Sequence, residues 1–99
     1  MRTIYKYPLQ IVDKQTVLMP KGAQIIAVMV QKEQLCVWAE CNPTGLVEPK
    51  TLWLIGTGNS MPTLYLFHLG SVLMGPFVWH VYEELPEEED ILPEGGDLA

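Results

Sequence analysis

The first 82 residues are a series of short apolar and β-branched runs separated by turn residues. Proline and glycine interrupt the pattern most clearly at Pro20-Lys21-Gly22 and Gly75-Pro76. The near ten-residue spacing and the short connections indicate antiparallel strands. We therefore expect an all-β fold, a small antiparallel barrel or sandwich of about seven short strands. The predicted strands cover 3–7 with a possible continuation over 9–12, then 15–19, 24–31, 35–41, 50–55, 64–74 and 77–82.

Two segments have a less regular pattern. Residues 64–74 are long enough for a short helix, but Gly70 and its aromatic and apolar neighbours favour a strand interrupted near that glycine. The runs 24–31 and 35–41 predict a hairpin closed through Lys32-Glu33-Gln34, although no Asn-Gly pair marks the turn.

Several predicted strands are apolar on both faces. Leu52 and Leu54 alternate with Trp53 and Ile55, and 77–82 follows the same pattern. A sheet with one face in water should carry polar residues on that face. We therefore expect that the chain covers the second face itself or forms a homo-oligomer, most simply a dimer.

Charge divides the chain into a β domain over 1–84 and an acidic, flexible tail over 85–99. Residues 1–82 have six basic and four acidic residues, whereas residues 83–99 have eight acidic residues and no base, so +2 and −8 give the net −6. Prolines, glycines and dense like charge oppose folding of the tail. The tail could solubilise the protein, occupy a basic groove on a partner, or fold back on the domain. Its expected interaction residues are Glu83, Glu84, Glu87, Glu88, Glu89 and Asp90.

Metal and catalytic sites are not expected. Zinc sites use closely spaced ligand pairs, but Cys36 and Cys41 are five apart and are predicted on opposite faces of one strand. A cysteine nucleophile paired with His68 or His80 needs a stabilised thiolate, which apolar surroundings do not give. We expect no metal, no cofactor and no enzymatic activity. No apolar run reaches the ~20 residues that span a bilayer.

A glycine-rich loop is the main ligand-binding candidate. Backbone N–H groups in such a loop can bind an anion, although its spacing matches neither dinucleotide-binding nor P-loop motifs, and a plain turn is the alternative. A nearby base would supply charge and an aromatic side chain would hold a flat group. Six dispersed bases form no patch, so direct nucleic-acid binding is not expected. The candidate ligand-binding residues are Gly56, Thr57, Gly58, Asn59, Ser60, Arg2, Lys6, Lys50 and Trp53.

Residues 5–17 (YKYPLQIVDKQTV), 19–23 (MPKGA), 35–39 (LCVWA), 55–58 (IGTG) and 79–83 (WHVYE) carry a family resemblance. Over roughly residues 4–83 the chain resembles a family of small, uncharacterised phage and prophage proteins, classed as a domain of unknown function. The resemblance implies a viral or prophage context and implies no activity. It leaves the acidic tail as an addition to the shared pattern.

These observations lead to one expected function and two alternatives. We expect a non-catalytic, phage-type accessory protein of the host cytoplasm that counters host defence by sequestering a ligand, such as a nucleotide-like immune signal. The first alternative is a protein-directed inhibitor of a host defence complex, which would use an apolar sheet face and the acidic tail. The second is a virion structural module. Nothing in the sequence separates sequestration from inhibition.

Overall fold

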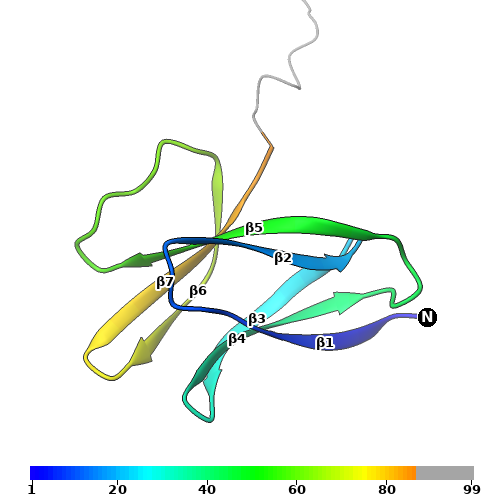
Figure 1. Cartoon of the computed structure of the whole chain (residues 1–99), viewed down its shortest axis with the longest axis horizontal. Helices are drawn as coiled ribbons and strands as arrows, with labels where there is room; N and C mark the ends of the chain where they lie inside the picture. The colour runs from blue at the N-terminus through cyan, green and yellow to red at the C-terminus, as the bar shows by residue number, and fades with distance from the viewer. Residues whose placement is uncertain (87–99) are drawn as a thin grey trace, which may run out of the picture.

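The computed structural model describes residues 1–86, and all regular elements in that range are strands (Figure 1). This confirms the all-β prediction. Within the same range no helix is long and apolar enough to cross a membrane. The tail residues Glu87, Glu88, Glu89 and Asp90 lie outside the described residues. The strands are β1 (Thr3–Pro8), β2 (Lys14–Pro20), β3 (Gln24–Gln31), β4 (Gln34–Cys41), β5 (Val47–Gly56), β6 (Leu66–Met74) and β7 (Phe77–Glu84).

The strands form two antiparallel sheets that are not closed into a barrel. The three-stranded sheet has the order β1-β4-β3, and the four-stranded sheet has the order β2-β5-β7-β6. The edge strand β3 of the first sheet lies against the edge strand β6 of the second. Of the two architectures expected from the sequence, the structure is therefore the two-sheet arrangement.

The core lies between the sheets and follows the two-residue period of the strands. In β4, alternate residues from Leu35 to Cys41 face inward and are fully buried, and Leu52 and Leu54 of β5 face them. Burying such side chains stabilises the fold by about 1.5–3 kcal/mol each. The buried core consists of Leu9, Met19, Ala23, Leu35, Val37, Ala39, Cys41, Leu52, Leu54 and Val81.

Gly70 allows the two sheets to approach each other. A Cβ atom at this position would lie 3.2 Å from Cβ of Val28 in β3, closer than ordinary packing allows. Immediately before it, the register of β6 shifts between His68 and Gly70, which is a β-bulge. The interruption predicted near Gly70 is therefore confirmed, and it marks the contact between β3 and β6.

The β3–β4 hairpin is also confirmed, and its turn is unusual. Lys32 has a φ of 52° and Glu33 a φ of 65°. Both residues therefore have the left-handed backbone conformation that glycine or asparagine normally adopts in such a turn. The possible continuation of the first strand over 9–12 is wrong. After Pro8 the chain crosses to the other sheet. Leu9 stays attached to β4 through its N–H, which donates to the Leu35 carbonyl at 2.8 Å, and through its carbonyl, which accepts from Gln34 Nε2 at 2.6 Å.

The two cysteines lie on opposite faces of β4, as predicted. Cys41 belongs to the core, whereas Cys36 lies on the outer face, where it is nevertheless only 1% exposed. The Lys6 ammonium donates to Gln31 Oε1 at 2.8 Å. Lys6 pairs with Trp38 and Gln31 with Gln34, so this bridge crosses β4 over the residue between them, which is Cys36.

Candidate ligand-binding cleft

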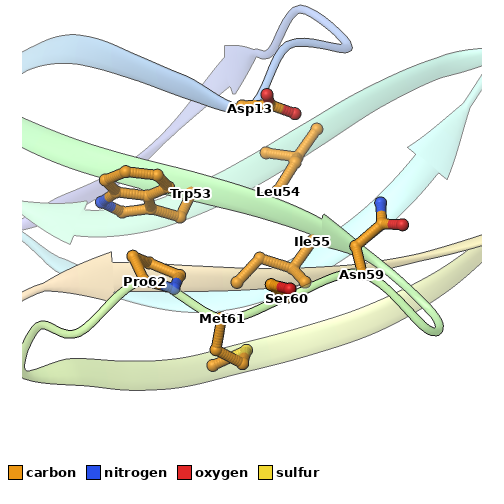
Figure 2. Close-up of a pocket in the computed structure, with 8 residues that line it drawn as sticks. All are labelled: Asp13, Trp53, Leu54, Ile55, Asn59, Ser60, Met61 and Pro62. Atoms are coloured by element: carbon orange, nitrogen blue, oxygen red, sulfur yellow. The ribbon is translucent and has the colours of Figure 1, made fainter.

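A cleft of about 480 Å³ lies between β5 and the 57–65 loop, beside the start of β2 (Figure 2). Its volume falls in the range of about 300–1,000 Å³ typical of small-molecule sites. The lining combines apolar side chains with three polar ones, of which one precedes β2 and two are consecutive in the loop. The lining residues are Asp13, Trp53, Leu54, Ile55, Asn59, Ser60, Met61 and Pro62.

The floor of the cleft follows from the alternation of β5. Since Leu54 faces the core, Trp53 and Ile55 point to the outer face of the four-stranded sheet. Ile55 is only 7% exposed, because the loop residues Met61 and Pro62 lie over this face (Figure 2). The backbone N–H of Leu54 donates to the carbonyl of Asp13 at 3.0 Å, which holds the carboxylate-bearing residue beside the cleft.

The loop is closed at both ends by backbone hydrogen bonds. The N–H of Asn59 donates to the Gly56 carbonyl at 3.0 Å, and Gly58 within this turn has a φ of 93°. Such a φ is easy for glycine and strained for other residues. At the far end, the N–H of Leu85 donates to the Tyr65 carbonyl at 2.8 Å. The predicted glycine-rich loop is therefore a turn that also forms one wall of a cleft.

The indole of Trp53 is held in place by two charged neighbours. Its Nε1–H donates to Glu84 Oε1 at 2.8 Å, and the Lys14 ammonium lies 5.3 Å from the ring centroid, a cation–π contact. Glu84, which the charge pattern grouped with the acidic tail, is thus part of β7. The bond to Glu84 limits rotation of the indole, so an aromatic surface is already oriented at the cleft.

Next to the cleft, four side chains form a continuous hydrogen-bonded chain, here called the His80 network. Thr57 Oγ1 lies 2.8 Å from His80 Nε2, and Ser71 Oγ lies 2.7 Å from His80 Nδ1 and 3.0 Å from His68 Nε2. The His68 ring also packs against Tyr82, with centroids 5.1 Å apart. A hydroxyl has one proton to donate and two lone pairs, so Ser71 can donate to one imidazole while it accepts from the other. The network can therefore pass protons or present donors to a ligand.

The structure brings together only part of the predicted binding set. Trp53, Asn59 and Ser60 line the cleft, Gly56 and Gly58 shape its loop, and Thr57 belongs to the His80 network. Each of the three predicted cations contacts a partner outside the cleft.

Arg2 and Lys6 lie on the three-stranded sheet, where Arg2 is 3.5 Å from Glu40 and Lys6 contacts Gln31. Lys50 forms a largely buried ion pair with Glu83 at 2.9 Å and lies on the opposite face of β5 from Trp53. The cation that the described structure places beside Trp53 is Lys14, which the sequence did not single out.

Sequence reasoning also missed the cleft residues Asp13, Met61 and Pro62 and the role of Ser71. It considered His68 and His80 only as metal ligands or bases. Within residues 1–86 no group of three or more histidine, cysteine or acidic side chains is placed to hold a metal ion. The face that His80 shares with Trp53 depends on the register between β5 and β7, and the β6 register that adds His68 and Ser71 depends on the bulge.

Comparison with known proteins gives one match. Residues 1–91 fit the model of a family described as Domain of unknown function (DUF7352). No curated protein and no solved structure matches the chain. The family match extends beyond the 4–83 range of the expected resemblance and into the acidic segment, so the view that the whole tail is an addition to the shared pattern is wrong. The chain therefore belongs to DUF7352, a family whose function is unknown.

Proposed function

We propose that the chain is a non-catalytic binding module that holds a small, flat ligand in the cleft between β5 and the 57–65 loop. The observation that supports this most strongly is the cleft itself, about 480 Å³ with an oriented Trp53 indole and three polar residues in its lining. A largely apolar pocket with a few placed polar groups is the usual form of a small-molecule site.

The polar groups suggest the ligand's chemistry. Asp13 offers a carboxylate that accepts hydrogen bonds, while Asn59 and Ser60 can both donate and accept. Amino and carbonyl groups at the edge of a nucleobase match this set. The apolar residues beside Trp53 suit the faces of a planar ring. A nucleobase is therefore the ligand class that we propose.

The biological role that we propose rests on the resemblance of the opening segment to phage and prophage proteins. In that context, tight binding without turnover would sequester a nucleotide-like immune signal in the host cytoplasm and so counter host defence. Sequestration requires affinity and abundance rather than catalytic machinery.

A second candidate function, inhibition of a host protein, is favoured by a different surface. On the outer face of the three-stranded sheet Ile4 is 52% exposed and Met29 is 49% exposed, on either side of β4. Exposed apolar side chains gathered on one face are typical of protein contact sites. The two candidates respond differently to removal of residues 87–99. Nucleobase binding in the cleft should persist, whereas inhibition of a basic partner should weaken, most of all at low salt.

Calorimetric titration with adenosine, a flat base without phosphate, tests the proposal. The chain offers a matched pair of variants, because Gly58 and Gly22 both have positive φ and open space at the Cβ position. Gly58→Val and Gly22→Val should cost similar stability, but only Gly58→Val should abolish adenosine binding. Absence of binding to the unaltered chain, or equal loss in both variants, would contradict the cleft as the site.

A further inference from the structure

We propose that the His80 network is an anion subsite that binds the phosphate-bearing part of a ligand whose flat group occupies the cleft, and that it does so by taking up protons. This inference rests on the proposed function and extends it from a nucleobase to a nucleotide-like ligand. In this subsite, imidazoles and hydroxyls bind the anion instead of the cations expected from the sequence.

The register places the network directly beside the cleft. Ile55, which lines the cleft, pairs with His80 on the neighbouring strand, and Trp53 pairs with Tyr82. Paired residues point to the same face and have Cα atoms about 4.5–5.5 Å apart. Thr57, the other end of the network, is two residues before Asn59 of the cleft wall. A ligand that extends from the cleft across β5 would therefore meet the network.

The neutral network is a poor anion site. A neutral His80 has one N–H and one unprotonated ring nitrogen, and both nitrogens lie within hydrogen-bond distance of a hydroxyl. One of the two hydroxyls, on Thr57 or Ser71, must then donate its only proton to the ring. That proton is not available to a ligand, and the network carries no positive charge.

Protonation changes this balance. A doubly protonated His80 donates at both nitrogens, so Thr57 and Ser71 become acceptors and their own protons can point outward. A protonated His68 donates to Ser71 Oγ through Nε2 in the same way. The result is two cationic imidazoles and two free hydroxyl donors on one sheet face, a set that suits a phosphate group.

The charged and titratable groups around the network do not cancel this charge. On β7, Glu84 accepts from the Trp53 indole, and Tyr82 contributes a ring face to His68. On β2, Lys14 adds a positive charge beside Trp53, while Asp13 lines the cleft next to it. Asp13 lies across β5 from the imidazoles, whereas Glu84 lies on β7 with His80, four residues away, where its carboxylate accepts the Trp53 N–H.

Sulfate is a suitable probe, because its charge stays constant across the range in which imidazoles titrate. NMR titration of the full chain should give sulfate binding roughly tenfold tighter at about pH 5.5 than at about pH 8, because a protonated imidazole carries a positive charge and donates at both nitrogens. His80→Gln should remove most of this pH dependence, and Ser71→Ala should weaken binding at the lower pH. Arg2→Gln, which removes a cation from the other sheet, is the matched control and should change nothing.

Equal sulfate affinity at both pH values, retention of the pH dependence by His80→Gln, or its loss in Arg2→Gln would overturn the subsite. Adenosine and adenosine monophosphate then separate this inference from the proposed function. Both proposals predict adenosine binding, but only the subsite predicts that the monophosphate gains affinity over adenosine at about pH 5.5 and that His80→Gln removes the gain. Binding of adenosine without that gain would overturn the subsite alone. Failure of adenosine to bind would contradict the cleft itself.

Discussion

The apolar residues on the outer faces of the two sheets are covered in different ways. Each sheet must cover apolar residues on the side away from the core. On the three-stranded sheet, the long side chains of Lys6 and Gln31 join across β4 and leave Cys36 almost fully buried. On the four-stranded sheet, the 57–65 loop lies over β5 and buries Ile55.

This difference explains why the cleft lies on only one of these two faces. Side chains that reach across a strand fill the space above it, whereas a loop held at its two ends leaves space beneath. The face of the three-stranded sheet keeps Ile4 and Met29 half exposed and suits contact with another protein surface. The face of the four-stranded sheet has Trp53 and the His80 network and suits a small ligand.

The largest effect is expected where the two sheets meet. Gly70→Val would place a branched side chain against Val28, so we expect the free energy of unfolding to fall by about 1–3 kcal/mol. Urea denaturation measures this loss. Leu73→Val, at an exposed position of the same strand, is the control and should stay within about 0.5 kcal/mol of the unaltered chain. Equal stability of both variants would show that the β3–β6 contact is loose.

We expect the chain to form a dimer in which a second copy covers the exposed outer face of the three-stranded sheet. Light scattering is expected to give the mass of a dimer, and Ile4→Glu should raise the dissociation constant at least tenfold, about 1.4 kcal/mol. Leu46→Glu, an exposed residue in the β4–β5 connection, provides the control. A monomer at every concentration would rule out the dimer and leave this face for a different protein.

The turns of the two sheets differ in which residues have a positive φ. This difference predicts a substitution that stabilises the fold. The β3–β4 turn places Lys32 and Glu33 at positive φ, whereas Gly58 has that role in the loop over β5. Replacing the pair by Asn-Gly should raise the free energy of unfolding by about 1 kcal/mol. Lys21→Asn, in a turn where Gly22 already has positive φ, should give no gain. No gain from the Asn-Gly variant would mean that contacts of the native turn offset its strain.

The smallest expected effect is on the reactivity of the Cys36 thiol. Lys6→Ala removes the bridge over Cys36 with little change in stability, and the rate at which a thiol reagent modifies Cys36 should rise several-fold. Cys41 faces the core and provides an internal control, since its rate should not change. An unchanged rate at Cys36 would show that backbone and neighbouring strands, rather than the bridge, protect it.

The sequence predicted the fold better than the cleft, for a physical reason. Strands and turns are encoded locally, so apolar runs and turn residues located all seven strands, and Gly70 marked the irregularity in β6. The glycine-rich loop and Trp53 could be singled out because a glycine-rich turn and an aromatic residue in the strand before it are themselves local signals. The contribution of Asp13 depends on how β2 pairs with β5, and that of Ser71 depends on a bulge.

The predicted cations illustrate the same limit. Arg2 and Lys6 are basic residues at the start of the chain, and composition alone could not show that β1 would pair with β4 in the sheet that lacks the cleft. Lys50 is only three residues from Trp53, yet strand alternation turns it to the other face, where Glu83 neutralises it. Proximity in sequence was therefore a poor guide to which charges the cleft would contain.

The three tryptophans allow the most direct test of the central claim that the cleft on the four-stranded sheet binds the ligand. Trp38 lies on the outer face of the three-stranded sheet, Trp79 packs against the core, and Trp53 lines the cleft. In an NMR titration with adenosine, the indole N–H resonance of Trp53 should shift in a saturable way while those of Trp38 and Trp79 stay in place. A saturable shift at Trp38 with none at Trp53 would contradict the account, because it would place the ligand on the other face.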